Sequence, residues 1–159
     1  MPQNNNDMKT MQMANAALLP EVARLVNEGH SVTLPLRGVS MRPFLEDRRD
    51  KAVLTAPSTL SKGDVVLAEI APGRYVLHRI VAITHDRITL LGDGNIATES
   101  CRRADIKAVA AGFMRKGRKR MDSTKGAKWR LYSAAWMLLR PARRYLLYIH
   151  RHIFTKKQA

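Results

Sequence analysis

The sequence predicts a mainly β fold, with a small antiparallel β domain preceded by one amphipathic helix and followed by basic amphipathic helices. Short runs of alternating apolar residues, separated by Gly, Pro and Asp turns, fill the chain between residues 31 and 114. Apolar residues at helical spacing come before these runs and again after them. A length of 159 residues suits one domain with an appendage.

A single amphipathic helix is expected before the sheet. Apolar residues recur at helical spacing between Ala14 and Glu28, and Gly29 follows as a stop signal. Residues 1–12 begin with a polar run, and we expect them to be disordered. We expect no signal peptide and no N-terminal membrane span, because residues 1–30 lack a basic head followed by an apolar run.

Six short strands should form the sheet. In the first, Val32, Leu34 and Leu36 alternate with other residues, as in a half-buried strand. This strand runs into Gly38. The other expected strands are Lys51–Thr55, Asp64–Ile70, Arg74–Thr84, Arg87–Leu91 and Lys107–Met114.

The charge divides the chain into a nearly neutral body and a basic end. Residues 1–113 hold 14 Lys and Arg against 12 Asp and Glu, whereas residues 114–159 hold 14 against Asp122 alone. We therefore expect a β domain with its leading helix over 13–117, a basic linker over 118–128 and a basic amphipathic helical tail over 129–159.

The only cysteine is Cys101, which excludes an internal disulfide. No Cys and His residues cluster at the spacing of metal ligands, so no metal and no cofactor are expected. A cytoplasmic protein is the expectation from these two observations.

Three short blocks contain a serine, a histidine and an aspartate in that order. Ser40 follows Gly38, His78 lies in an expected strand, and Asp93 lies in a Gly-Asp-Gly-Asn turn. Nucleophilic acyl transfer needs such a set, because a serine hydroxyl must lose its proton to a nearby base. The three blocks therefore indicate a serine protease.

The loop that contains Ser40 should lie at the sheet edge. Gly38 and Pro43 bracket the serine in a stretch that cannot be regular helix. Backbone N–H groups of this loop are expected to bind the oxyanion, and Met41 is expected to anchor the loop. The alternative is an ordinary turn serine beside a strand.

The other two members of the set have structural alternatives of their own. Alternation places His78 on a largely apolar strand face, where a histidine can be a base or a plain core residue. Asp93 can bring a carboxylate to the Nδ1 side of that histidine, or it can simply form a hairpin turn. Lys51 and Lys62 are rival bases, but Lys62 falls in a turn, where a lysine keeps its charge.

These blocks together resemble the clan that joins type I signal peptidases to self-cleaving repressors. The resemblance covers residues 18–117 and is carried by a series of motifs in the same order. The series is Ser40-Met41-Arg42-Pro43, then Gly63-Asp64-Val65-Val66, then His78-Arg79-Ile80, then Gly92-Asp93-Gly94-Asn95.

The resemblance implies a fold of the signal peptidase and repressor-peptidase type, with Ser40 as nucleophile and His78 as base. His78 replaces the lysine of most bacterial members, as in the histidine variants of signal peptidases. Gly38 stands where many signal peptidases carry a second serine that donates to the oxyanion, so backbone donors are expected to act here.

The tail is expected to form two helices separated by Pro141. Trp129, Tyr132 and Trp136 recur at helical spacing among basic residues, which is typical of helices at a lipid interface. We expect residues 129–159 to bind an anionic membrane surface, on the inner face of the cell membrane. Packing of this face on the β domain or on a partner is the alternative, and nucleic-acid binding is disfavoured because no nucleic-acid-binding module is recognised.

The resulting prediction is a serine endopeptidase that cleaves a peptide or precursor protein by a Ser–His mechanism. Self-cleavage at Ala110-Ala111-Gly112 is a weaker reading, since these residues fall in an expected strand. The alternative belongs to a different class of function: a non-catalytic module of the same fold that binds a peptide or a membrane.

Overall fold

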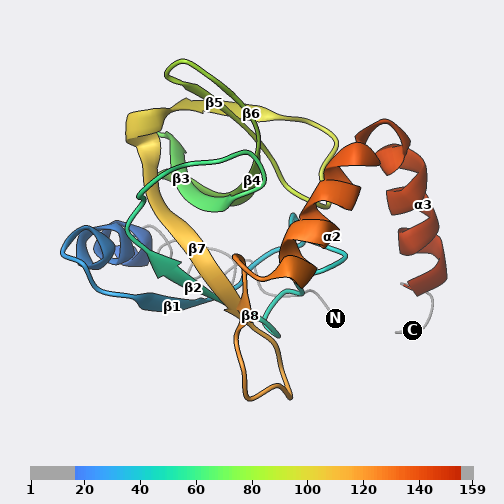
Figure 1. Cartoon of the computed structure of the whole chain (residues 1–159), viewed down its shortest axis with the longest axis horizontal. Coiled ribbons are helices and arrows are strands. Elements are labelled where there is room, and N and C mark those ends of the chain that lie inside the picture. The colour runs from blue at the N-terminus through green and yellow to red at the C-terminus, as the bar shows by residue number, and fades with distance from the viewer. Residues whose placement is uncertain (1–16, 155–159) are drawn as a thin grey trace, which may run out of the picture.

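The chain folds into one antiparallel sheet with helices before and after it (Figure 1). The computed structural model describes residues 17–154, so the expectation of disorder over 1–12 lies outside the described residues. The sheet has eight strands in the order β1-β2-β7-β3-β4-β5-β6, with β8 paired to β7. These strands are β1 (Val32–Pro35), β2 (Lys51–Thr55), β3 (Val65–Ala71), β4 (Arg74–Thr84), β5 (Arg87–Leu91), β6 (Glu99–Arg102), β7 (Ile106–Met114) and β8 (Asp122–Ser123).

Three α-helices accompany the sheet in the described part of the chain. Helix α1 covers residues 17–27, α2 is Ala127–Leu138 and α3 is Arg143–Phe154. Two short 3₁₀ helices, η1 (Arg103–Asp105) and η2 (Arg140–Ala142), connect neighbouring elements. None of these helices has the length and apolar character that crossing a bilayer requires.

The mainly antiparallel β architecture predicted from the sequence is confirmed. All six expected strands are present, and β2, β4 and β5 have the expected bounds. The strands β6 and β8 were not expected. Cys101 is the only buried residue of β6, and β8 has two residues, so neither produces an alternating apolar pattern.

The core consists of two clusters on the two faces of β3. Val65 and Leu67 pack in the first cluster with α1 and Phe113, whereas Val66 and Ala68 pack in the second with β5 and β6. Successive side chains of a strand point to opposite faces, so β3 is buried on both sides. The sheet is therefore curled around β3, and β6 comes back against it.

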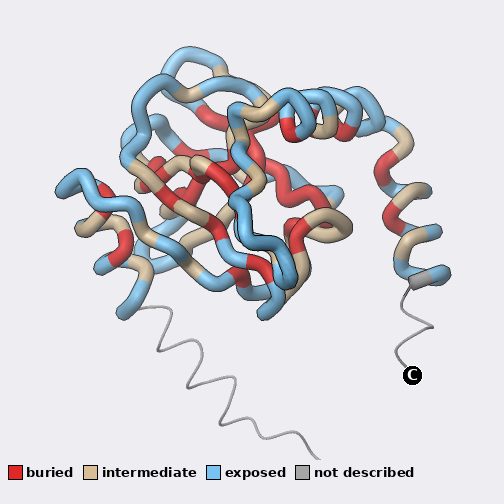
Figure 2. The backbone as a smooth tube through the Cα atoms, turned by 60° about the horizontal axis from the view of Figure 1, so that its bottom comes forward, coloured by how far each residue is buried: buried red, intermediate tan, exposed pale blue. Residues whose placement is uncertain are grey.

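Helix α2 packs its aromatic side on the β domain. The Trp129 and Phe113 ring centroids lie 4.8 Å apart, and Phe44 contacts Tyr132 and Trp136 at 3.7 and 5.4 Å. The alternative expected for this aromatic side, packing on the β domain, is therefore what the structure has, and binding of residues 129–159 to a membrane stays a prediction. The burial along α2 is visible in Figure 2.

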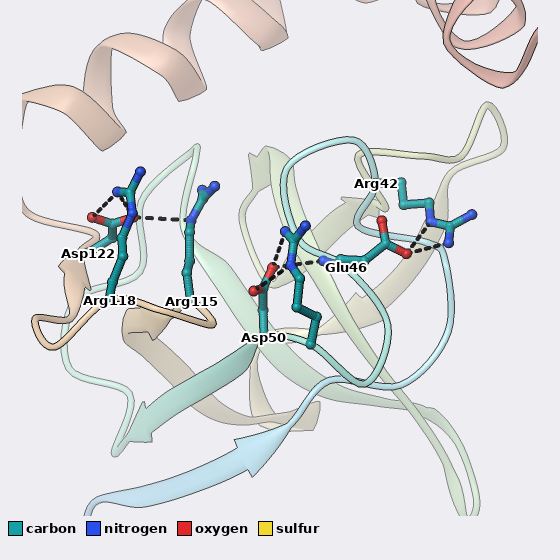
Figure 3. A network of polar contacts seen from close by, with 7 residues as sticks. Arg42, Glu46, Asp50, Arg115, Arg118 and Asp122 are labelled. Atoms are coloured by element: carbon teal, nitrogen blue, oxygen red, sulfur yellow. Dashed lines mark hydrogen bonds and ion pairs between the residues drawn. The ribbon is translucent and has the colours of Figure 1, made fainter. Parts of the chain in front are cut away.

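The expected linker 118–128 contains β8 and the start of α2, and an ion pair with Arg115 joins it to the end of β7. Asp122 accepts contacts from Arg115 at 3.1 Å, from Arg118 at 3.3 Å and from Lys128 at 3.9 Å. Figure 3 shows the first two. As predicted, Pro141 separates the two tail helices, and α3 stands away from the sheet (Figure 1).

We predict that Phe113→Ala lowers the free energy of unfolding by about 3–5 kcal/mol, because it leaves a cavity between β7 and Trp129. Leu138→Ala, on the outer side of α2, is the control and should change stability by less than about 0.5 kcal/mol. Urea unfolding followed by tryptophan fluorescence measures both. Equal stabilities of the two variants would contradict the packing described for α2.

Candidate active site

Ser40 lies in the loop between β1 and β2, at the edge of the sheet. This loop starts with Gly38, whose φ of +86° is in the left-handed region that glycine adopts readily. The Gly38 N–H donates to Asp47 Oδ1 at 2.9 Å, and Met41 is buried in the core beneath the loop. The buried Met41 therefore holds this loop to the core, whereas the Gly38 N–H is already bonded.

The far side of the same loop is fixed by charged side chains (Figure 3). The buried Asp50 carboxylate accepts the Glu46 N–H at 2.9 Å and pairs with Arg49 at 2.8 Å. Glu46 in turn pairs with Arg42, two residues after the serine. These contacts join the end of the loop to the residues next to Ser40 and limit how the loop can move.

The Gly-Asp-Gly-Asn turn packs directly against the serine loop. The Gly94 N–H donates to the Ser40 carbonyl oxygen at 2.7 Å. A Cβ added to Gly92 would lie 2.6 Å from that same oxygen and 3.0 Å from His78 Nε2. The backbone at Ser40 and the imidazole of His78 therefore meet at Gly92, and only a residue without a side chain fits between them.

His78 lies on β4 with its ring buried and only 4% of the residue exposed. Its Nδ1 lies 2.7 Å from Oε2 of Glu99, although the two groups are not aligned as a hydrogen bond. Arg74 contacts the other oxygen of the same carboxylate at 3.2 Å. Glu99 thus occupies the Nδ1 side of the histidine, and Nε2 is left on the side of the serine loop.

The surroundings of His78 favour its neutral form. Burial lowers the pKa of His78 below its ordinary value of 6.5, and the neighbouring Glu99 carboxylate opposes this shift without cancelling it. The imidazole is therefore uncharged at neutral pH. An uncharged ring with its proton on Nδ1 can accept a second proton at Nε2, as a general base must.

The expectation that Asp93 orients His78 needs correction, because its carboxylate is used elsewhere. Arg79 Nε donates to Asp93 Oδ1 at 2.8 Å and Arg79 Nη2 donates to Oδ2 at 2.6 Å. The Tyr132 hydroxyl donates to Oδ2 at 3.3 Å. Asp93 is fully buried in these contacts and contributes to His78 only through its charge.

Arg79 is held by more than the aspartate. Its Nη1 donates to the Gly63 carbonyl at 3.0 Å and to Ser133 Oγ at 2.6 Å. Its guanidinium lies 5.2 Å from the Trp129 ring centroid and 5.6 Å from that of Tyr132. Neighbouring residues of β4 thus provide the candidate base and a buried anchor for the turn beside it.

The Ser40 N–H is a candidate backbone donor for an oxyanion. Within residues 17–154, no backbone carbonyl accepts the Ser40 N–H. Because Gly38 carries no side chain and its own N–H is bonded to Asp47, any oxyanion site here depends on the Ser40 amide and its neighbours.

A small cavity of about 130 Å³ opens beside Ser40. Its walls are mostly apolar and include Leu34 on β1, Leu36 just after it and Leu77 on β4. The cavity can therefore hold an aliphatic side chain of a peptide that lies across the serine.

The other candidate residues do not join the site. Lys51 and Lys62 are exposed, which disfavours them as bases. The described residues contain no group of His, Cys, Asp and Glu that could hold a metal ion. Burial raises the pKa of the Cys101 thiol to about 11, so it is a poor nucleophile. Ala110-Ala111-Gly112 lies inside β7, which pairs with strands on both sides.

Two residues of the site were missed at the sequence level. Glu99 lies on the unexpected strand β6, and its contact with His78 depends on the curling of the sheet. Arg79 follows His78 in the motif His78-Arg79-Ile80, but the residues next to it in the sequence do not indicate Asp93 as its partner.

No family model matches the chain, and no curated protein gives a match to it.

We predict that Asp93→Asn lowers the free energy of unfolding by about 3–5 kcal/mol, because it leaves the buried Arg79 without its countercharge. Asp86→Asn, at an exposed turn, is the control and should be nearly neutral. The double substitution Arg79→Met with Asp93→Leu should recover much of the loss. Urea unfolding measures all three variants, and a neutral Asp93→Asn would contradict the role given to the pair.

Proposed function

We propose that this protein is a serine endopeptidase in which Ser40 attacks a peptide bond and His78 transfers the proton. The observation that carries the proposal is the meeting of the Ser40 loop and His78 Nε2 at Gly92. The buried neutral ring and the acidic partner at its Nδ1 support it further. A fold of the signal peptidase and repressor-peptidase type is part of the same proposal, supported by the series of four motifs and the mainly β sheet.

In the proposed reaction, His78 Nε2 removes the proton of the Ser40 hydroxyl as the oxygen attacks the substrate carbonyl carbon. Glu99 stabilises the imidazolium that forms, because its carboxylate lies at Nδ1. The imidazolium then gives its proton to the leaving amine, and an acyl group remains on Ser40. Water, activated by the same histidine, releases the acyl group as a carboxylic acid and restores the serine.

The substrate is proposed to be an extended segment of a peptide or precursor protein. The cavity beside Ser40 supports an aliphatic side chain next to the cleaved bond. Within residues 17–154, β1 is the last strand on its side of the sheet and lines the same cavity, and an edge strand of this kind can pair with an extended peptide.

We predict that Ser40→Ala lowers the rate of peptide cleavage by about a thousandfold or more, because no nucleophile remains. The exposed Ser58→Ala is the matched control and should keep full activity. A fluorophosphonate probe should label the wild type at one serine and leave Ser40→Ala unlabelled. If neither cleavage nor labelling depends on Ser40, the fold acts as a non-catalytic peptide-binding module instead.

Glu99→Gln is expected to lower the plateau rate by up to about ten-thousandfold, as when the orienting carboxylate of other triads is removed. The pKa of His78 should also fall further, because the carboxylate that raises it is gone. The acid limb of the pH–rate profile, below 6.5 in the wild type, should therefore move to lower pH. An acid limb that stays at the same pH or moves to higher pH would argue against Glu99 as the partner of His78.

A further inference from the structure

The outer sides of α2 and α3 carry apolar residues that the β domain does not cover. On α2, Leu131 is 78% and Leu138 is 82% exposed, one above the other at a spacing of seven residues. The inner side of this helix already holds Trp129 and Trp136. Helix α2 is therefore apolar on two sides, and the core explains only one of them.

Helix α3 also carries exposed apolar residues, and they form a longer row than on α2. Tyr145, Ile149 and Ile153 follow each other at a spacing of four residues, so they form one stripe along the helix. All three are at least half exposed. The tube view in Figure 2 shows α3 standing apart from the sheet, and its residues 144, 145, 148, 149 and 151–153 are exposed.

Basic residues flank both apolar stripes. Lys128 and Arg130 are exposed on α2, and Arg144 and Arg151 are exposed on α3. No aspartate or glutamate follows Asp122 in the sequence, so no acidic side chain of the tail offsets this charge. An apolar stripe bordered by cations matches the boundary between the acyl chains and the headgroups of an anionic bilayer.

We propose that the outer sides of α2 and α3 bind the surface of an anionic lipid bilayer. The exposed leucines and isoleucines insert among the acyl chains, and the basic residues contact the lipid phosphates. This differs from the aromatic contact expected from the sequence, since Trp129 and Trp136 remain packed on the β domain. The proposal does not depend on the proposed peptidase activity.

Charge and chemistry argue against two other occupants. A second copy of the chain would bring the same basic residues face to face in a symmetric contact, which is electrostatically unfavourable. Nucleic acid would match the charge, but it would leave the leucine and isoleucine side chains without an apolar partner.

The test is co-sedimentation of the full chain with vesicles of equal parts phosphatidylglycerol and phosphatidylcholine. The wild type should bind these vesicles, and binding should weaken as salt is added or when phosphatidylcholine alone is used. The Ser40→Ala chain should bind like the wild type, which separates this proposal from the peptidase proposal. If the same fraction of wild-type protein sediments with and without anionic vesicles, the membrane proposal is overturned.

Three paired variants test the residues. Leu131→Gln with Leu138→Gln, and Ile149→Gln with Ile153→Gln, should each lower the partition coefficient about tenfold or more. Arg144→Gln with Arg151→Gln should lower it roughly fivefold for each arginine. Leu18→Gln on α1, also an exposed leucine, is the matched control and should bind like the wild type.

Circular dichroism confirms that each variant is folded, as expected for exposed positions. Vesicle binding that survives both apolar substitutions overturns the proposal. So does a wild type that binds duplex DNA in preference to vesicles, or one that dimerises through these helices and leaves the vesicles unbound.

Discussion

The buried ion pair between Arg79 and Asp93 is the interaction on which the candidate site depends. Two charges removed from water are tolerated only when nearly every donor and acceptor is satisfied. Here Gly63, Tyr132 and Ser133 complete the set; Gly63 lies in the turn before β3, and the other two lie on α2. The pair therefore fixes the turn that contacts the Ser40 carbonyl, and it does so through residues far apart in the sequence.

His78 and Arg79 are neighbours on β4, so their side chains point to opposite faces of the strand. His78 points to the side where Glu99 and the serine loop lie, and Arg79 points to the side covered by α2. The two acidic residues therefore have different partners: Asp93 pairs with Arg79, and Glu99 lies between His78 and Arg74. Asp93 neutralises the permanent cation, whereas Glu99 meets a group that is neutral until it accepts a proton. This separation leaves the candidate base His78 neutral while the adjacent Arg79 charge stays balanced.

The local pattern of the sequence was sufficient for the strands but not for the partners of charged residues. Alternation fits β2 and β5, where burial is stronger on one face, whereas β4 has four consecutive buried residues and is bounded by its turn residues. Alternation could not identify β6, where Cys101 alone is buried, and so Glu99 was missed. Asp93 was assigned to His78 because a sequence shows where a carboxylate occurs and not which cation it reaches. The aromatic spacing of α2 likewise predicts a buried side without saying whether protein or lipid covers it.

The contact of Ser133 with Arg79 also determines when the site can be completed during synthesis. Helix α2 follows every described strand in the chain, so the ribosome makes it after the whole sheet. Until residue 133 has emerged, the guanidinium on β4 lacks one of its hydrogen-bond acceptors and the aromatic rings that cover it. Nascent chains therefore hold an incompletely supported Gly92 turn beside the Ser40 loop, so the arrangement on which the proposed peptidase activity rests is complete only after α2 has been made.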